Sequence, residues 1–365
     1  MVMGYLHEHK DWWRFRYDGL RIVTELGRVR AKQGQVLGRM MSLGFASQNE
    51  ATLSNISIEL VRSSAIEGER LNLDEVRSSI ARRLGIEAAA LVPASRYVDG
   101  VVEMLLDATQ NYSQALTSDR LFGWHNLLFP TGMSGMYRIE VGKYRSGEMQ
   151  VVSGAMGKER EHYRAPSASR VPAEMERFIA WVNGNVNIDG VLKAAIAHLW
   201  LVSIHPFDDG NGRITRALTE MLLARCENCG KRFYSMSAAI KEMQKEYYDV
   251  LERTQRGDGD ITEWILWFLR CFERALDASL ETLSKVMSKA DFWERHRDVA
   301  FNERQRKLLN MLLDGFYGKL TSGKWAKIAK CSPDTALNDI KDLIAKGILL
   351  RAKEGGRSTN YLLVD

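Results

Sequence analysis

The sequence has little cysteine and proline and lacks any long apolar run. It contains four cysteines and six prolines in 365 residues. Four scattered cysteines are too few for a disulfide framework, which excludes the class of small disulfide-stapled secreted proteins. No run of about 18 apolar residues predicts a membrane span, and the polar, aromatic N-terminus lacks the apolar segment of a signal peptide. We therefore expect a cytoplasmic protein with no membrane partner.

Cys226 and Cys229 form a lone Cys-x-x-Cys pair. Zinc would require further ligands, and the sequence has no second pair of this kind. A redox pair would follow a strand, whereas this one follows a helical pattern. We expect two ordinary thiols near a helix end.

The positive charge of the chain is concentrated near its C-terminus. The net charge is +5. Residues 297–365 hold 13 Lys and Arg against 8 Asp and Glu, so the rest of the chain is balanced. This bias makes nucleic acid a candidate partner of the C-terminal segment.

Apolar residues recur at helical spacing through most of the chain, and a single region has strand-like composition. This pattern predicts a mainly α fold. We divide the chain into an N-terminal helical domain at 1–92, a central domain at 93–288 and a C-terminal domain at 296–365. The length suits about two or three domains.

The N-terminal domain is predicted to contain a helix over about residues 54–68. Ser54 or Asn55 is a suitable N-cap, and Gly68 is a suitable end. A second helix, with the sequence LDEVRSSIARRL, is expected to stop at Gly85.

The central domain combines helical patterns with a glycine-rich loop. Residues 96–109 and 118–129 have helical spacing, and Pro172 suits the first turn of a further helix. The loop contains QVVSG (150–154) and EHYRAP (161–166), which are short strand candidates. We expect these two segments to pair as a hairpin.

The C-terminal domain has three helical patterns followed by a Gly-Gly hairpin, which is the order of a winged helix-turn-helix. That fold makes DNA a candidate partner. The expected recognition helix, however, carries Asp334, Asp339 and Asp342, which disfavour contact with phosphates. Contact with a protein, or with a second copy in a homodimer, is an equally strong hypothesis.

The most informative stretch is HPFDDGNGRITR, residues 205–216. An apolar helical pattern at 191–204 precedes it and helical spacing resumes after it, which predicts a tight corner between two helices. Gly210 and Gly212 allow the turn and let backbone N–H groups approach a ligand closely. The start of the second helix adds unpaired N–H groups and a positive dipole end, which favour a phosphate.

Charged side chains around this corner indicate its chemistry. Arg213 and Arg216 are three residues apart, on one helix face, and two guanidinium groups suggest more than one phosphate. A carboxylate beside a phosphate cradle suggests Mg²⁺, and His205 can take a proton near neutral pH. These residues predict phosphoryl or nucleotidyl transfer. The alternative is a structural helix corner with surface arginines and a capping histidine.

The stretch resembles the signature of the Fic family, His-x-Phe-x-Asp/Glu-Gly-Asn-Gly-Arg-x-x-Arg, at every fixed position. The resemblance implies a Fic-type helical core with a β-hairpin flap. It also implies transfer of AMP from ATP to a Ser, Thr or Tyr hydroxyl of a target protein, or of the chain itself, with release of pyrophosphate. ATP is the implied co-substrate, and Mg²⁺ is the implied metal.

The resemblance implies a role for each residue of the corner. His205 would be the general base toward the target hydroxyl, and Asp209 would hold Mg²⁺, which leaves Asp208 at the variable position. Arg213 would grip the β-phosphate and Arg216 the γ-phosphate. The anion cradle would consist of Gly210, Asn211 and Gly212.

Two other stretches resemble parts of the same family. The predicted hairpin resembles the flap that binds the target segment by strand addition and covers the nucleotide. Its contacting residues would be Val151, Val152, Ser153 and Gly154. KEYYDVLERTQRGD resembles the stretch that lines the adenosine pocket. The residues at the matching positions are Tyr247, Tyr248 and Gln255. The alternative for this stretch is an aromatic stripe in a helical core.

SSAIEG, residues 63–68, resembles the inhibitory motif of regulated Fic proteins. Ser63 and Glu67 are four residues apart, so they share a helix face. By the resemblance, Glu67 would pair with Arg216, occupy the γ-phosphate position and inhibit the enzyme from an N-terminal inhibitory helix. The alternative is a solvent-exposed Glu67 beside surface arginines.

The resemblance leaves other activities open. The same residues would serve a deAMPylase, in which the inhibitory glutamate positions a water that removes AMP from the target. A winged-helix regulator with a nucleotide-sensing core is a non-enzymatic alternative, although an intact His205 argues against a pure sensor. Other family members transfer UMP, phosphate or phosphocholine, and no motif here identifies the target protein or the signal that releases Glu67.

Overall fold

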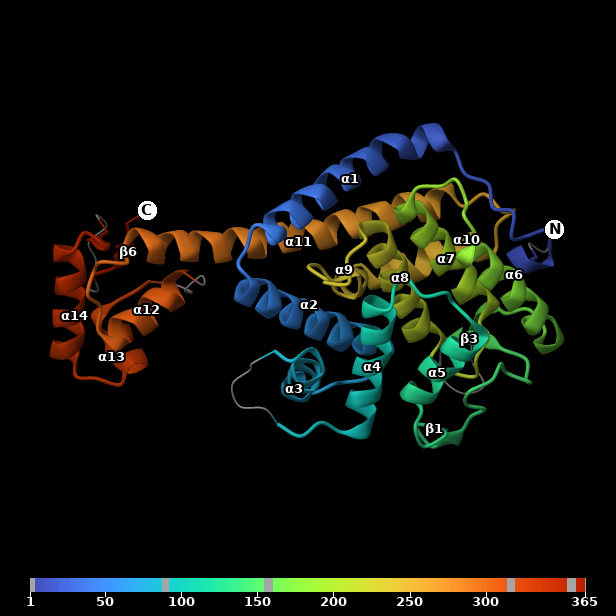
Figure 1. The fold of residues 1–365 in the computed structure, drawn as a ribbon, viewed down its shortest axis with the longest axis horizontal. Coiled ribbons are helices and arrows are strands. Elements are labelled where there is room, and N and C mark those ends of the chain that lie inside the picture. The colour runs from blue at the N-terminus through green and yellow to red at the C-terminus, as the bar shows by residue number, and fades with distance from the viewer. Residues whose placement is uncertain (1–3, 87–91, 154–159, 314–318, 353–358, 365) are drawn as a thin grey trace. The chain divides into compact units, whose positions relative to one another are not determined.

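The computed structural model describes residues 4–86, 92–153, 160–313, 319–352 and 359–364. Contacts divide the chain into two compact units, Met1–Ser279 and Leu280–Asp365. Figure 1 shows that both units are built mainly of helices, with small two-stranded sheets. This confirms the mainly α prediction. Within the described ranges, no helix is both long enough and apolar enough to cross a membrane.

The first unit contains a series of helices that follow one another along the chain. They are α1 (Gly19–Met41), α2 (Phe45–Ile66), α3 (Leu73–Leu84), α4 (Arg96–Gln110), α5 (Ser118–Leu128), α6 (Val171–Asn183), α7 (Gly190–Ile204), α8 (Asn211–Glu227), α9 (Met236–Glu242), α10 (Gln244–Gln255) and the first part of α11 (Thr262–Arg295). Short 3-10 turns occur at Leu6–Glu8 and Ala168–Arg170. Helix α11 runs without interruption through the stretch after residue 288 where the sequence suggested a domain break.

Helix α7 lies at the centre of the first unit. All its residues from Ala194 to Ile204 are buried, as expected of a helix that is apolar on every face. It packs against α6 on one side and α8 on another, and α8 packs in turn against α2, α4 and α5. The corner between α7 and α8 is therefore held inside the core rather than on a loose surface loop.

Helix α2 starts at Phe45, so the predicted N-cap at Ser54 or Asn55 is wrong. The helix extends upstream because its buried residues continue there and pack against α3 and α9. Its C-terminal end agrees with the prediction, since Ile66 is the last helical residue and Gly68 has a left-handed φ of +82°. This end of α2 lies beside α8.

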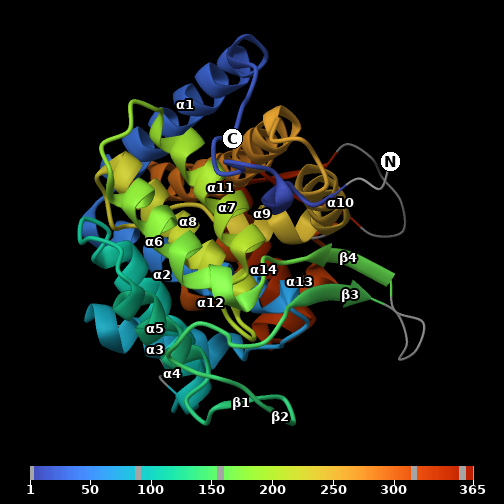
Figure 2. The same cartoon turned by 90° about the vertical axis from the view of Figure 1, so that its right-hand side faces the viewer.

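The predicted hairpin is present and stands next to α10. Strand β3 (Gln150–Ser153) pairs antiparallel with β4 (Arg160–Arg164), and Figure 2 shows the two strands beside α10. The hairpin is anchored by Tyr163, which is buried and donates a hydrogen bond to the carbonyl of Ser203 (2.7 Å). Gly154, the last residue of the expected strand, lies outside the described residues.

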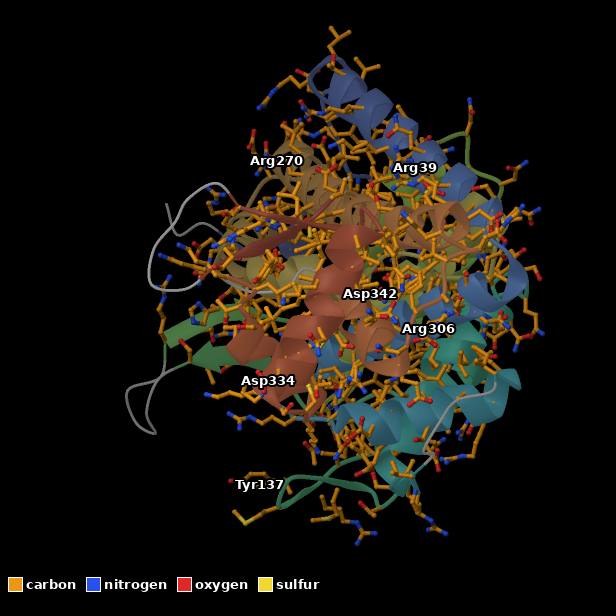
Figure 3. The ribbon with its side chains drawn as sticks, turned by 90° about the vertical axis from the view of Figure 1, so that its left-hand side faces the viewer. Arg39, Tyr137, Arg270, Arg306, Asp334 and Asp342 are labelled. Carbon is orange, nitrogen blue, oxygen red and sulfur yellow. The ribbon has the colours of Figure 1, made fainter. Side chains whose placement is uncertain are left out.

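A second, smaller hairpin lies in the predicted glycine-rich loop, ahead of β3. Strand β1 (Met133–Ser134) pairs with β2 (Tyr137–Arg138). Two-residue strands leave no alternating pattern to detect in a sequence. Tyr137 is 75 % exposed at this hairpin, and its side chain is labelled in Figure 3.

The second unit has its own small core. It comprises the last part of α11, then α12 (Glu303–Leu313), α13 (Ser322–Ala329), α14 (Pro333–Ala345), β5 (Leu349–Arg351) and β6 (Tyr361–Leu363). Residues of all these elements surround the buried Trp325. Helices followed by a hairpin are the order that the sequence predicted, and the winged-helix assignment stays a prediction.

The three acidic residues of α14 differ in their roles. Asp339 is buried and accepts hydrogen bonds from Arg304 (2.8 Å) and Asn302 (2.8 Å), so it holds the unit together. Asp334 and Asp342 are exposed on the same helix and are labelled in Figure 3. Negative side chains on the surface of this helix oppose contact with nucleic-acid phosphates.

Candidate functional site

The corner between α7 and α8 is held by the side chain of Asn211. Its Oδ1 accepts a hydrogen bond from the backbone N–H of Phe207 (3.0 Å), and its Nδ2 donates to the carbonyl of the same residue (2.7 Å). Phe207 is fully buried, with its ring centroid 4.4 Å from that of His125. His205 ends α7 in the left-handed conformation, with φ +52°. Side-chain hydrogen bonds and a buried ring therefore hold this loop in one shape.

Both glycines of the corner are needed for a physical reason. Gly210 has φ +79°, and an added Cβ would lie 2.9 Å from Cε2 of Phe129. At Gly212, an added Cβ would lie 2.2 Å from Oε1 of Glu67. A carboxylate therefore rests against the bare backbone at the start of α8, where the helix dipole and unpaired N–H groups favour an anion.

A cavity of about 450 Å³ opens at this corner, within the usual range of small-ligand sites of about 300–1,000 Å³. The corner contributes His205, Asp208, Asp209, Gly210, Asn211 and Gly212. The β3–β4 hairpin contributes Val151, Val152 and Ser153, and α10 contributes Tyr247, Tyr248 and Gln255. Glu67 completes the wall. Residues proposed separately from four stretches of sequence thus surround one space.

Arg216 does not line this cavity, because other residues of the protein hold its guanidinium group. Its Nη1 lies 2.8 Å from Oε1 of Glu67. Its Nε donates to the hydroxyl of Ser63 (2.8 Å), and its Nη2 donates to the carbonyl of the same residue (2.9 Å). The C-terminal end of α2 therefore occupies all three nitrogens of this buried arginine.

Arg213 is also buried and engaged. Its Nη1 donates to the carboxylate of Glu69 (2.9 Å) and to the hydroxyl of Tyr97 (2.7 Å), which in turn hydrogen-bonds to Glu69. Its Nη2 lies 3.8 Å from Oδ1 of Asp209. Its guanidinium carbon is 5.1 Å from the ring centroid of Phe129. The same segment after α2 thus places one carboxylate on each arginine of the motif.

The sequence analysis missed Glu69 and Tyr97. A signal exists in the order Glu67-Gly68-Glu69, because the left-handed glycine turns the chain sharply between the two glutamates. Both carboxylates can then face α8. Three residues alone do not predict this role, because the contact with α8 exists only when α2 packs beside that helix.

The imidazole of His205 is held in one orientation by a backbone contact. Its Nδ1 lies 3.0 Å from the carbonyl oxygen of Val202, which can only accept, so Nδ1 carries the proton and Nε2 keeps a lone pair. Burial lowers the pKa of His205 below its ordinary value. Arg145 donates from Nε to the carbonyl of His205 (2.8 Å) and holds the backbone in place.

The carboxylate of Asp209 fits a magnesium ion that arrives with a phosphate. It is half-exposed in the cavity wall and accepts a hydrogen bond from the hydroxyl of Ser134 on β1. Asp208 instead accepts from the backbone N–H of Glu140 (2.8 Å). Nowhere in the described part of the chain do three or more His, Cys, Asp or Glu gather to hold a metal. Mg²⁺ needs only one or two carboxylates when phosphate oxygens complete its shell.

Residues of helix α10 pack in the protein core and also line the cavity. Tyr247 is buried, and its hydroxyl lies 3.0 Å from Nε2 of His198. Gln255 is buried and donates from Nε2 to the hydroxyl of Ser203 (3.1 Å). Tyr248 is 43 % exposed. The aromatic stripe that we gave as the alternative for this helix is therefore also the cavity wall.

The hairpin and α10 are joined by polar contacts that the sequence analysis did not foresee. The hydroxyl of Ser153 lies 2.6 Å from Nε2 of His162, and Nδ1 of His162 lies 2.7 Å from Oε2 of Glu252. Arg160 donates to Oε1 of Glu252 (3.1 Å). Ser153, His162 and Glu252 all line the cavity.

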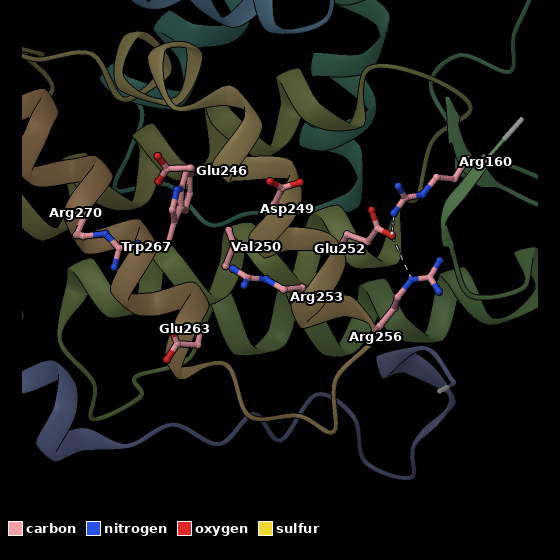
Figure 4. Close-up of a pocket in the computed structure, with 10 residues that line it drawn as sticks. All are labelled: Arg160, Glu246, Asp249, Val250, Glu252, Arg253, Arg256, Glu263, Trp267 and Arg270. Carbon is pink, nitrogen blue, oxygen red and sulfur yellow. Dashed lines mark hydrogen bonds and ion pairs between the residues drawn. The ribbon is translucent and has the colours of Figure 1, made fainter. Parts of the chain in front are cut away.

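A second hollow of about 470 Å³ lies along α10 and α11 (Figure 4). It is lined by Arg160, Arg253, Arg256, Arg270, Glu246, Asp249, Glu252, Glu263, Val250 and Trp267. Ion pairs join Glu252 to Arg160 and Arg256, as the dashed lines in the figure mark. Four arginines balance four carboxylates, so the hollow favours neither anions nor cations, and we assign it no ligand.

Two family descriptions match the chain. A "Domain of unknown function (DUF4172)" matches residues 5–86, which include α1, α2 and α3. The Fic/DOC family matches residues 115–223, which include the β3–β4 hairpin and the corner.

Curated relatives carry the name protein adenylyltransferase Fic. The protein from Culex quinquefasciatus is 26 % identical over 244 residues, which cover 66 % of this chain and 44 % of that protein. The protein from Aedes aegypti is 26 % identical over 283 residues, which cover 76 % of this chain and 50 % of that protein. The chain thus spans about half the length of the curated relatives it matches.

Solved structures share the fold. A Fic family protein from Desulfovibrio desulfuricans aligns with a TM-score of 0.54 at 21 % identity, over 93 % of this chain and 96 % of that one. Fic-1 from C. elegans aligns with a TM-score of 0.52 at 20 % identity, over 74 % and 75 % of the two chains. At these identities the likeness is one of fold. The Fic/DOC family model thus matches residues 115–223 of this chain, and the solved structures show a shared fold.

Proposed function

We propose that this protein transfers AMP from ATP to a side-chain hydroxyl of a target protein, or of itself, and releases pyrophosphate. The observation that carries the proposal is the meeting, in one cavity, of an anion-binding helix start and a neutral histidine with a free lone pair. The Fic/DOC match and the adenylyltransferase names of the relatives support it.

Each part of the corner has a chemical task in this proposal. Nε2 of His205 takes the proton of the acceptor hydroxyl as that oxygen attacks the α-phosphorus of ATP. The N–H groups at the start of α8, left accessible by Gly210 and Gly212, hold the phosphates. Arg213 and Arg216 bind the outer phosphates once their present partners leave. Mg²⁺ at Asp209 would neutralise charge that develops on the phosphate oxygens.

The rest of the cavity would hold the nucleoside and the acceptor. Val151 and Val152 of the hairpin and Tyr248 and Gln255 of α10 form a wall of mixed apolar and polar character, as nucleoside sites have. The exposed edge of the β3–β4 hairpin would bind the acceptor segment by strand addition. This arrangement leaves the phosphates toward α8 and the nucleoside toward α10.

We further propose that the protein is inhibited by the segment that follows α2. The carboxylate of Glu67 lies against Gly212 and on Arg216, where a phosphate would otherwise bind. Ser63 fixes the same arginine from the preceding helical turn. A nucleotide could then enter only with its terminal phosphate displaced from Arg216.

Intact-mass spectrometry after incubation with ATP and Mg²⁺ tests both proposals. We expect the Glu67→Gly variant to gain one or more AMP units, wild type to gain few, and Glu67→Gly/His205→Ala to gain none. AMP transfer would be disproved if the Glu67→Gly protein gained no AMP and if, with labelled ATP, no protein of an added lysate gained the label either. Loss of AMP from that modified product when wild type is added would instead support the reverse activity.

A further inference from the structure

The chain of contacts from Ser153 through His162 to Glu252 fixes where each proton lies. Glu252 receives hydrogen bonds from Arg160 and His162. Although burial opposes it, hydrogen bonds from His162 and Arg160 keep the pKa of Glu252 below its ordinary value. An ionised carboxylate can only accept, so Nδ1 of His162 must carry a proton and donate it.

The direction of the next hydrogen bond follows from the first. With its proton on Nδ1, a neutral imidazole has only a lone pair on Nε2. Whenever this imidazole is neutral, the hydroxyl of Ser153, 2.6 Å away, donates its hydrogen to Nε2 of His162. The oxygen of Ser153 then has no proton left for a ligand, and it presents lone pairs alone to the cavity.

These contacts lie at the nucleoside end of the cavity rather than at the phosphate end. Glu252 is one helical turn from both Tyr248 and Gln255 on α10, and all three line the cavity. The N-terminus of α8 at the other end attracts phosphate, whereas the charge of Glu252 is already compensated by Arg160 and Arg256, so this end offers phosphate no comparable site. The groups of the ligand that approach Ser153 are consequently those of a base or a sugar.

We propose that Ser153 recognises a hydrogen-bond donor on the nucleoside, and that His162 and Glu252 are positioning residues that fix Ser153 as an acceptor. This inference rests on the proposed nucleotide-dependent function. Two nucleoside groups have the required chemistry: the 6-amino group of adenine and the hydroxyls of ribose. A 6-oxo base offers only an acceptor at the same place, so it would face the lone pairs of Ser153 without a proton between them.

Binding measurements with four nucleotides separate the two sources. The background is Glu67→Gly/His205→Ala, which frees the phosphate position and prevents turnover. The nucleotides are ATP, inosine triphosphate with its 6-oxo base, 2′-deoxy-ATP and 3′-deoxy-ATP, each titrated by calorimetry with Mg²⁺. Ser153→Ala should weaken ATP binding about five- to tenfold. For the one analogue that lacks the recognised donor, the same substitution should leave the affinity unchanged or, where a facing acceptor is relieved, increase it. The analogue that does not lose affinity therefore shows whether Ser153 binds the 6-amino group of adenine or a hydroxyl of ribose.

A second substitution tests the positioning residues with a readout that a merely structural role would not produce. In Glu252→Gln, Arg160 and Arg256 lie nearest to Oε1, so they would keep the amide oxygen on their side and leave the amide NH₂ facing His162. The imidazole would then accept at Nδ1 and donate at Nε2, and the Ser153 hydroxyl would turn its proton toward the ligand. The ratio of the affinity for ATP to the affinity for the analogue that lacks the recognised donor should therefore fall by about tenfold or invert.

Matched controls and contrary outcomes complete the test. Glu246→Gln on the exposed side of α10, and Ser146→Ala in the loop before β3, should leave all four affinities unchanged. The inference would be overturned if neither Ser153→Ala nor Glu252→Gln changed the ratio of ATP affinity to the affinity of any analogue. It would also be overturned if mass spectrometry of Glu67→Gly found AMP attached to Ser153. If no nucleotide binds even to the background variant, the proposed function itself falls, and the inference falls with it.

Discussion

The carboxylate of Glu67 lies 2.8 Å from Nη1 of Arg216, while Ser63 accepts from both remaining nitrogens of the same guanidinium group. Arg216 is 3 % exposed, whereas the side chain of Glu67 is 34 % exposed in the cavity wall, so the buried member of this pair is the cation. Removing the carboxylate leaves a buried cation without its counter-charge, which an anionic ligand can then satisfy. If the protein functions as proposed, the pair would therefore link inhibition of the site to its affinity for phosphate.

The first prediction concerns this pair. Glu67→Gly should increase AMP incorporation by at least about tenfold, the factor that 1.4 kcal/mol brings, because ATP no longer competes with the carboxylate for Arg216. Glu67→Gln should give a smaller increase, since the amide keeps the size of the side chain without its charge. Incorporation of labelled AMP at equal protein and ATP concentrations measures both. An unchanged rate in Glu67→Gly would contradict the inhibitory role.

The second prediction concerns Glu69, which pairs with Arg213. In the Glu67→Gly background, Glu69→Gln should add a further increase of up to about fivefold, because a partly exposed pair is worth up to about 1 kcal/mol. In wild type the same change should have little effect, since Glu67 still occupies Arg216. Glu103→Gln, which removes a surface partner of Arg83, is the matched control. A lower rate in the double variant would mean that Glu69 orients Arg213 for catalysis instead.

Much of the fold was predictable because its signals are local. Pro172 lies at the start of α6, and Gly85 caps α3 in the left-handed conformation, as the sequence indicated. The stretch at 205–216 predicted a helix corner with phosphate-binding character, and it forms a corner with a cavity. Such features depend on a few consecutive residues, whose geometry is nearly independent of the rest of the chain.

The remaining features depend on contacts between distant segments. Glu69 and Arg213 are separated by 144 residues, and His162 and Glu252 by 90. Neither pair follows from spacing along the chain, because a contact of this kind exists only after α2 and the hairpin have packed in place. The early start of α2 was missed for a related reason, since tertiary packing extends a helix whose cap signals lie further along.

The third prediction concerns pH. Protonation of His205 removes the base, so the rate of AMP transfer should fall as the pH decreases through its pKa. Burial lowers that pKa below the ordinary value of 6.5, so the rate should be flat near neutrality and fall only in more acidic buffers. The profile is best measured on Glu67→Gly at saturating ATP, with thermal unfolding followed at each pH. A loss of rate that begins above pH 6.5 while the protein stays folded would contradict this assignment.

The fourth prediction uses the closeness of Gly212 to Glu67. In wild type, Gly212→Ala would bring a Cβ to 2.2 Å from Oε1 of Glu67 and 3.1 Å from Nη1 of Arg216. The carboxylate must then move off its buried partner, and overpacking of this kind costs about 1–3 kcal/mol of the free energy of unfolding. In Glu67→Gly the first contact disappears, and the gain of about 0.5–1 kcal/mol for alanine over glycine in a helix offsets what remains.

A double-mutant cycle on the free energy of unfolding therefore isolates the contact. The loss caused by Gly212→Ala should be large in wild type and close to zero in Glu67→Gly. Gly123→Ala in α5 is the control, since nothing lies within 4 Å of its added Cβ, and it should be neutral or stabilising in both backgrounds. Equal losses from Gly212→Ala in the two backgrounds would mean that Glu67 does not rest on the start of α8. The site would then be open to phosphate even without a signal that displaces the inhibitory segment.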